Sequence, residues 1–143
     1  MPETELPPVR GLTIKQPWAW AITAGKNVEN RSWKVPEKYI GATLLVHAGL
    51  RPAPGAFLDE RILSLPAMPP RLPAGKVLAV ARLAGCHREE GGCCAPWGDT
   101  DAYHWQLEDV RALPEPLEYT GALSLWAPSP ALLQKVKAVP LSP

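Results

Sequence analysis

The chain has 143 residues, of which 18 are proline, 6 are tryptophan and 1 is phenylalanine, and its 15 Lys and Arg nearly balance its 14 Asp and Glu. This length indicates a single domain, and a hydrophobic share of 46% excludes a disordered chain. So much proline excludes a helical bundle, because proline breaks helix interiors and central strands, and it favours short elements joined by stiff loops.

The expected elements are short. Alternating or β-branched apolar stretches predict strands, and apolar residues at helical spacing predict helices. Strands are expected over residues 11–15, 28–33, 43–47, 75–83, 102–110 and 119–126, and helices over residues 18–24, 55–65 and 128–136. About six strands with about three helices predict an α+β fold built on a small β-barrel.

The domain is expected to span residues 10–138, with a disordered lead-in over residues 1–9 and a tail over residues 139–143. No apolar run approaches the roughly 20 residues that span a bilayer, and no secretion signal opens the sequence. The 3 cysteines are an odd number, which favours reduced thiols. These features predict a cytoplasmic protein without a membrane partner.

Charge is distributed unevenly along the chain. Residues 10–51 hold seven Lys and Arg against two Glu, whereas residues 99–118 hold six acids against one Arg. The basic third can face the phosphates of a nucleic acid. Alternatively, the basic and acidic regions pair with each other in the fold, and the sequence leaves both readings open.

The most informative stretch covers residues 12–33, which read LTIKQPWAWAITAGKNVENRSW. In the strand expected over residues 28–33, side chains alternate between two faces, so Glu29, Arg31 and Trp33 share one face. An acid, a base and an indole on one face are not typical of a core. The structural interpretation is a surface ion-pair cluster that fixes a turn, and the functional interpretation is a polar site that contacts a ligand.

This stretch resembles the signature of the ASCH domain family, a branch of the PUA-like superfamily. Gln16-Pro17-Trp18 matches the family's opening, and residues 26–33 match its Lys-x-x-Glu-Asn-Arg core with a following aromatic residue. Here glycine stands directly before Lys26, whereas the family more often has it two residues before. Residues 43–49, 75–83, 104–107 and 121–126 resemble the family's later strands.

The resemblance implies a small PUA-like β-barrel of five to six strands with about three flanking helices. It also implies a cleft that accepts RNA, a nucleoside or a modified base. We therefore expect an ASCH-type domain that binds RNA or a modified pyrimidine nucleoside over a polar floor of Lys26, Glu29 and Arg31. One alternative is a hydrolase, either an N(4)-acetylcytidine amidohydrolase or a ribonuclease. A second is a protein-interaction or regulatory domain without nucleic-acid chemistry.

Lys26 and Glu29 are the candidate catalytic residues of the hydrolase alternative. A lysine beside an arginine in a cleft loses its proton more easily, through desolvation and like-charge repulsion. Glu29 can relay a proton or activate water, and the planar fork of Arg31 suits a phosphate or carbonyl oxygen. In the amidohydrolase branch a threonine acts near the position of Glu29, so the resemblance carries that mechanism over incompletely.

The candidates for substrate binding are aromatic and polar side chains near this cluster. Aromatic faces beside cations suit base stacking, although large apolar side chains also fill cores. With one phenylalanine available, some tryptophans must supply core volume. The predicted binding residues are Gln16, Trp18, Arg31, Trp33, His47, Trp97 and His104.

No metal site and no cofactor are predicted. Cys93 and Cys94 are adjacent, whereas zinc sites use separated ligand pairs. Folding can nevertheless assemble Cys86, His87, Cys93 and His104. The favoured interpretation is a packed, thiol-bearing loop that covers one side of the site.

Overall fold

The computed structural model describes residues 8–139 of the chain. The expected lead-in and tail therefore lie outside the described residues, apart from Pro8, Val9 and Val139. Val9 is already the first residue of β1.

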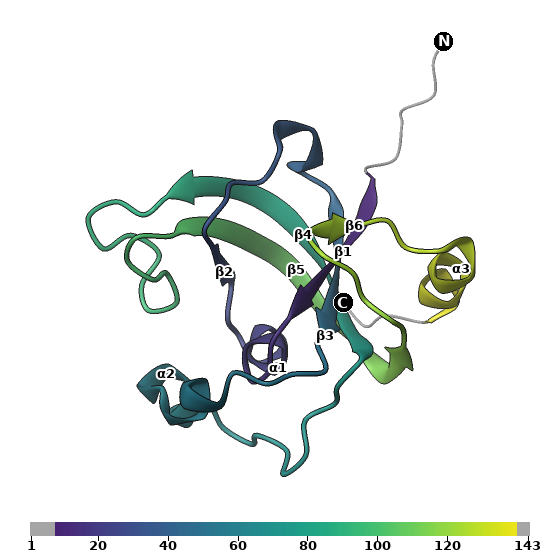
Figure 1. Ribbon diagram of the computed structural model, residues 1–143, viewed down its shortest axis with the longest axis horizontal. Coiled ribbons are helices and arrows are strands. Elements are labelled where there is room, and N and C mark those ends of the chain that lie inside the picture. Colours follow the sequence, from purple (N-terminus) through teal and green to yellow (C-terminus); the bar gives the residue numbers. More distant parts are fainter. Residues whose placement is uncertain (1–7, 140–143) are drawn as a thin grey trace.

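Six strands form one curled, mixed sheet that makes a half-barrel, so the expected α+β fold is confirmed. The order across the sheet is β2-β5-β4-β3-β1-β6, and β1 runs parallel to β3 while the other neighbours are antiparallel. Figure 1 shows β4 and β5 as the two long strands of the sheet. The strands are β1 (Val9–Ile14), β2 (Val28–Arg31), β3 (Thr43–Ala48), β4 (Lys76–Arg88), β5 (Tyr103–Glu118) and β6 (Leu125–Trp126).

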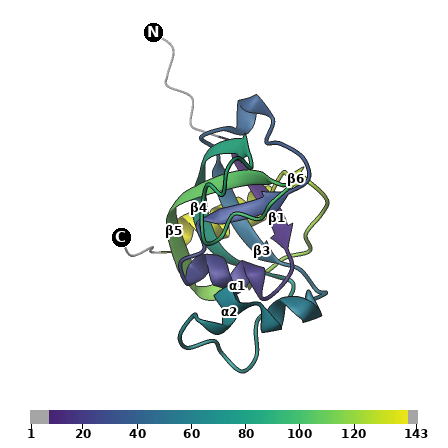
Figure 2. The same ribbon diagram turned by 90° about the vertical axis from the view of Figure 1, so that its left-hand side faces the viewer.

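Short helices surround this sheet. In both Figure 1 and Figure 2, α1 and α2 lie together at one end of the curled sheet, and Figure 1 shows α3 apart from them. Among the described residues, no helix has the length and apolar character needed to cross a membrane. The helices are α1 (Trp18–Thr23), α2 (Glu60–Leu63) and α3 (Pro130–Ala138), with 3-10 helices η1 (Glu37–Tyr39) and η2 (Pro54–Leu58).

One predicted helix is broken and one predicted strand is much shorter than expected. The helix expected over residues 55–65 is broken at Asp59, whose extended backbone ends η2 and whose carboxylate caps α2 by accepting the Arg61 N–H at 2.9 Å. The strand expected over residues 119–126 shrinks to β6, because Ser124 has a φ of 58° and interrupts the extended backbone. By contrast, the expected Ser129 cap of α3 is confirmed: its hydroxyl accepts the Leu132 N–H at 3.1 Å.

The β4–β5 hairpin is longer than predicted. β5 continues through Pro114 and Pro116 to Glu118 while it pairs with β4. β2 borders β5 only over residues 103–106, so both prolines stand where β5 is an edge strand. An edge tolerates a missing N–H, and the prolines therefore do not end the strand.

The core follows from strand alternation. In β3, Leu44, Val46 and Ala48 face the interior of the curled sheet, whereas Leu45 packs with Leu132 of α3 on the other face. A third apolar cluster joins α1, β2 and α2 to the loop between β4 and β5, through Ala21, Val28, Ile62 and Trp97. These three clusters position β2 and both flanking helices around the signature.

Candidate functional site

The signature residues form one buried polar cluster at β2. Lys26 Nζ donates to Glu29 Oε1 at 3.0 Å and also to the carbonyl oxygen of Val28. Arg31 Nε donates to the second oxygen of Glu29, Oε2, at 2.9 Å. The side chains of Lys26 and Glu29 are 2% and 7% exposed, and that of Arg31 is 25% exposed. Arg31 is therefore the member of the cluster that reaches solvent.

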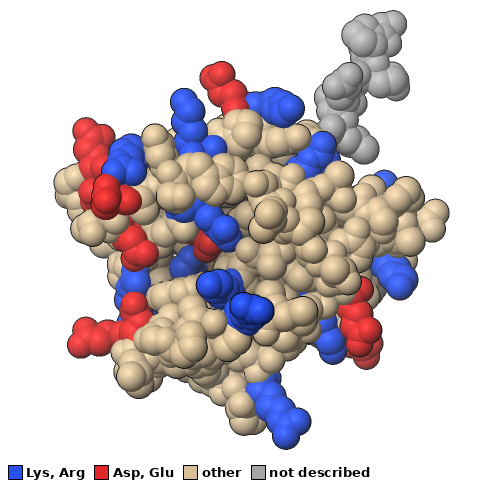
Figure 3. All heavy atoms as spheres, in the orientation of Figure 1, with Lys and Arg blue, Asp and Glu red and all other residues tan. Residues whose placement is uncertain are grey.

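Arg31 also joins this cluster to β1. Its Nη2 donates to the carbonyl oxygen of Thr13 at 3.0 Å. Because β2 and β1 are not neighbours in the sheet, this bond spans the open side of the half-barrel. Figure 3 shows a recess on this face with acidic and basic atoms at its bottom.

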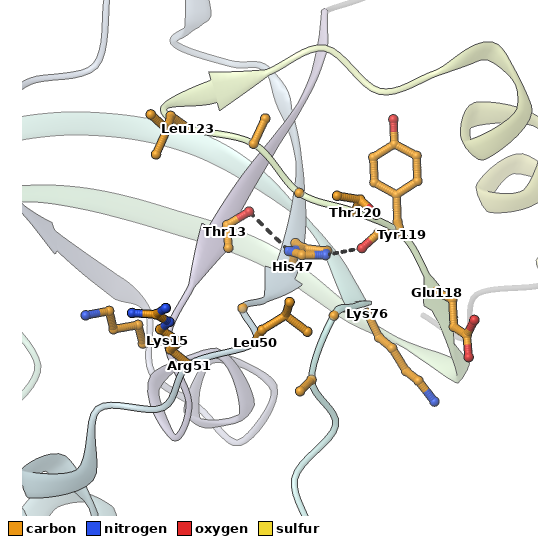
Figure 4. A pocket seen from close by; sticks show the side chains of 15 residues that line it. Thr13, Lys15, His47, Leu50, Arg51, Lys76, Glu118, Tyr119, Thr120 and Leu123 are labelled. Atoms are coloured by element: carbon orange, nitrogen blue, oxygen red, sulfur yellow. Dashed lines mark hydrogen bonds between the residues drawn. The ribbon is translucent and has the colours of Figure 1, made fainter.

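A cavity of about 840 Å³ lies at the ends of the parallel strands β1 and β3. The start of β4, the end of β5 and residues 119–123 complete its wall. Figure 4 shows Lys15, Arg51 and Lys76 around it, against the single acid Glu118. The cavity thus carries an excess of positive charge.

The floor of this cavity is a chain of hydrogen bonds. Thr13 Oγ1 accepts from the Trp126 indole N–H at 3.1 Å and lies 3.1 Å from His47 Nδ1. His47 Nε2 lies 2.6 Å from the Tyr119 carbonyl oxygen, which only accepts, so Nε2 carries the proton and Nδ1 accepts from Thr13. Burial lowers the pKa of His47 below its ordinary value, although the bond to Tyr119 opposes this.

Gly121 covers that floor at close range. A Cβ atom at this position would lie 2.2 Å from Thr13 Oγ1 and 2.8 Å from the ring of His47. Real Cβ atoms do not approach other atoms so closely, so the backbone over the Thr13–His47 pair requires glycine. Gly121 was not among the residues predicted from the sequence.

The predicted aromatic residues pack around the signature cluster and not in the cavity. Lys26 Nζ lies 5.6 Å from the ring centre of Trp18. Trp33 packs edge-on against the buried Trp105, with ring centres 4.7 Å apart. Trp97 is buried in the third apolar cluster, where it packs with Ile62 of α2. These indoles fill the space beside the cluster, and Trp18 and Trp33 remain half-buried.

Two predicted polar residues hold backbone segments. Gln16 is buried, accepts the Trp20 N–H at 2.8 Å and donates to the Pro73 carbonyl oxygen at 3.0 Å. It also borders a second cavity of about 490 Å³. His104 is fully buried and its Nε2 donates to the Asp99 carbonyl oxygen at 2.7 Å. Among the nine predicted side chains, His47 is the one that lines the larger cavity.

Asn30 is a signature residue to which the sequence assigned no role. Its Nδ2 donates to the Trp97 carbonyl oxygen at 2.9 Å, and its Oδ1 accepts the Asp99 N–H at 2.8 Å. Asn30 stands on the face of β2 opposite Glu29 and Arg31, which is the signal that separates its role from theirs. It fastens the β4–β5 loop to β2.

Arg61 was also missed, because it lies outside the signature. Its guanidinium is 5.3 Å from the ring centre of Trp18 and 5.8 Å from that of Trp97. It pairs with Asp59 at 2.8 Å and Asp99 at 2.9 Å, and its hydrogen bond lowers the pKa of Asp59. Arg61 therefore ties α2 to the same loop that Asn30 holds.

The acidic stretch does not neutralise the basic third. Six ion pairs occur within residues 8–139, and none of them joins residues 10–51 to residues 99–118. The acids of that stretch pair elsewhere: Asp99 with Arg61, Glu108 with Arg82 and Asp101 with Arg88. Neither Lys15 nor Arg51 has an ion-pair partner among these residues, although Glu118 of the acidic stretch lines the same cavity.

The β4–β5 loop brings cysteines and histidines together. The ligand atoms of His87, Cys93, Cys94 and His104 all lie within 4.8 Å of one another. Three of these four were considered from the sequence, and Cys94 stands in the cluster instead of Cys86. The loop turns at Cys93 and Cys94, because Cys94 has a backbone φ of 63°. No sequence pattern predicts this conformation.

Comparison with protein-family models finds none that matches this chain, and comparison with curated proteins finds no match either. The similarity to the ASCH signature therefore rests on the residues quoted for it.

Proposed function

We propose that this chain is an ASCH-type domain that binds RNA or a modified pyrimidine nucleoside. The observation that carries the proposal is the position of Thr13 between the signature cluster and the cationic cavity. Its carbonyl oxygen accepts from Arg31 and its hydroxyl bonds to His47. Thr13 of β1 thus contacts both the signature cluster at β2 and the floor of the cavity.

The cavity has the size and charge that such a ligand needs. Small-molecule sites occupy about 300–1,000 Å³, and this cavity of about 840 Å³ falls within that range. Lys15, Arg51 and Lys76 suit phosphate oxygens, which supply most of the affinity in nucleic-acid binding. The exposed edge of Arg31 extends the basic surface toward the recess beside β2.

The hydrogen bonds of the cluster favour binding over hydrolysis. A nucleophilic or basic lysine needs a neutral amine, whereas Lys26 is paired with Glu29 at 3.0 Å. Both oxygens of Glu29 are occupied, one by Lys26 and one by Arg31. The hydrolase, an N(4)-acetylcytidine amidohydrolase or a ribonuclease, remains the second candidate, because Lys26 and Glu29 are within hydrogen-bond reach in a buried site.

Binding is tested by fluorescence anisotropy with a single-stranded RNA oligonucleotide over a series of salt concentrations. Arg51→Ala is expected to weaken binding and to lower the slope of log affinity against log salt by about 0.7, the value for one lost phosphate contact on a single strand. Lys137→Ala is the matched control, because Lys137 is an exposed cation on α3 outside the cavity. Absence of binding at low salt contradicts the proposal.

Hydrolysis is tested by incubating the protein with N(4)-acetylcytidine and measuring cytidine. Turnover that is lost in Lys26→Ala and kept in Lys34→Ala, an exposed lysine, would replace the binding proposal with the amidohydrolase. No turnover removes that alternative. If neither RNA nor nucleoside binds, the exposed Leu50 and Leu123 at the cavity favour a protein-interaction domain instead.

A further inference from the structure

A second candidate site lies at the far end of the β4–β5 hairpin. His87 on β4 and His104 on β5 are direct cross-strand partners, and their rings lie 5.4 Å apart at an interplanar angle of 74°. Cys93 and Cys94 come from the loop that joins these two strands. Two paired strands therefore supply two histidines, and the loop between them supplies two cysteines, so that four side chains able to bind a metal lie together.

Three sulfur–nitrogen separations in this cluster come close to those of a tetrahedral ion, and all four ligand atoms lie within 4.8 Å of one another. Cys93 Sγ lies 3.3 Å from His87 Nε2 and 3.5 Å from His104 Nδ1, and Cys94 Sγ lies 3.2 Å from His87 Nε2. With metal–sulfur bonds of about 2.3 Å and metal–nitrogen bonds of about 2.0–2.1 Å, a tetrahedral centre separates sulfur from nitrogen by about 3.5 Å. The four atoms can surround one ion with small shifts.

The hydrogen bonds around the cluster prepare it for a cation. His104 Nε2 donates to the Asp99 carbonyl oxygen at 2.7 Å, so the lone pair of His104 is on Nδ1, the atom that faces Cys93. The Glu90 N–H donates to Cys93 Sγ at 3.4 Å, which orients that sulfur. Such outer partners fix the tautomer and orientation of metal ligands.

The packing closes the cluster on the loop side. A Cβ atom at Gly98 would lie 2.6 Å from His104 and 2.9 Å from Cβ of Cys94. The backbone at Gly98 therefore lies directly against two of the four side chains. Together with the full burial of His104, this contact limits the access of water to the centre of the cluster.

We propose that His87, Cys93, Cys94 and His104 bind one Zn²⁺ ion as a structural site. Two thiolates and two imidazoles in tetrahedral arrangement select zinc among the common divalent ions, and four protein ligands leave no open position for substrate. Binding displaces one proton from each thiol, so the Zn²⁺ and two thiolates form a neutral centre.

A metal ion at this site would hold the β4–β5 loop, to which β2 is hydrogen-bonded. Asn30 of β2 and Arg61 of α2 both bind the backbone of residues 97–99, a few residues from Cys94. A metal ion at the cluster would fix this loop against β4 and β5 and so support β2. The site stands apart from the 840 Å³ cavity, and the proposal does not depend on the proposed function.

The first experiment measures metal in the full chain, purified under reducing conditions from cells grown with added zinc. Elemental analysis is expected to give one zinc per chain. After chelation, Co²⁺ is expected to bind with the intense visible bands of a tetrahedral centre and a near-ultraviolet thiolate-to-metal band. A folded protein with no stoichiometric zinc and no tetrahedral Co²⁺ spectrum overturns the proposal.

The second experiment assigns the ligands with matched variants. Cys93→Ala and Cys94→Ala are expected to lower the affinity for Zn²⁺ by more than the about 10- to 100-fold that loss of an outer partner causes. Cys86→Ala is the control, because Cys86 is the remaining cysteine and its sulfur accepts the Val35 N–H outside the cluster. Equal loss in all three variants contradicts the assignment. If a variant does not fold, the Co²⁺ spectrum of the wild-type chain still decides.

Discussion

Thr13 and His47 face each other across the parallel pair of β1 and β3, and the threonine hydroxyl donates to the histidine Nδ1 at 3.1 Å. The Thr13 hydroxyl also accepts from Trp126, and His47 donates to the Tyr119 carbonyl oxygen. In the neutral ring these contacts therefore place the proton of His47 on Nε2. This arrangement makes the stability of the fold sensitive to acid.

Stability is expected to fall as the pH drops below about 6.5, the ordinary pKa of histidine. Burial lowers the pKa of His47 in the folded chain, so the unfolded chain binds the proton more tightly. The contribution of His47 is complete above the unfolded pKa and is lost as the pH falls from there through the lower pKa of the folded chain. Urea unfolding between pH 5 and pH 8 measures this, and His47→Gln should flatten the profile. An identical slope in the variant would rule His47 out as the cause.

Glu29→Gln is expected to lower the free energy of unfolding by about 3–5 kcal/mol. The substitution leaves the cation of Lys26, 2% exposed, without its counter-charge, and breaking a buried pair on one side is strongly destabilising. Glu108→Gln is the matched control, because Glu108 pairs with Arg82 at an exposed site, where a pair contributes about 0–1 kcal/mol. Urea unfolding of both variants compares them, and equal losses would contradict the prediction.

Asn30→Ala is expected to lower the free energy of unfolding by about 1–3 kcal/mol, because it leaves the Asp99 N–H without its partner and leaves the Trp97 carbonyl with only the longer bond from Arg61 at 3.3 Å. The effect should concentrate in the loop, so hydrogen exchange at Asp99 should speed up. Asn27→Ala is the control, since Asn27 is exposed. Unchanged exchange at Asp99 would show that Asn30 does not hold the loop.

Gly121→Ala is expected to destabilise the fold by about 1–3 kcal/mol, the usual effect of overpacking, and to displace residues 119–123 from the cavity floor. Its new Cβ would meet Thr13 at 2.2 Å. Gly55→Ala is the control, because a Cβ at Gly55 meets no atom within 4 Å. Thermal unfolding of the two variants gives the comparison, and equal midpoints would mean that the segment moves freely away.

Much of the fold could be predicted from local patterns. The strands at β1, β2 and β4 alternate along the sequence, β3 is an apolar and β-branched run, and the Ser129 cap of α3 is a local signal. The break at Asp59 could not be predicted, because the apolar spacing of residues 55–65 continues through it, and the carboxylate's bond to Arg61 decides the outcome. The full length of β5 was missed because prolines end most strands, and only the sheet order shows that Pro114 and Pro116 stand on an edge.

The candidate site was predicted in part. Alternation placed Glu29 and Arg31 on one face, and the structure joins them in one cluster with Lys26. The cationic cavity was missed because it depends on β1 and β3 being parallel, which brings Lys15 and Arg51 to the same edge of the sheet. The direction in which two strands pair cannot be read from the local sequence of either strand. Cys94 was set aside because adjacent cysteines are poor partners in extended chain, whereas a left-handed residue turns the chain at this pair.

The bond between Arg31 and Thr13 closes the open side of the half-barrel with a side chain instead of a backbone ladder. Elsewhere around the sheet, neighbouring strands separate only if several backbone hydrogen bonds break together. Between β2 and β1, which do not pair, the Arg31 guanidinium supplies this bond, and its side chain is 25% exposed. An anion that draws Arg31 outward would therefore widen the barrel between these two strands while leaving every strand pairing intact.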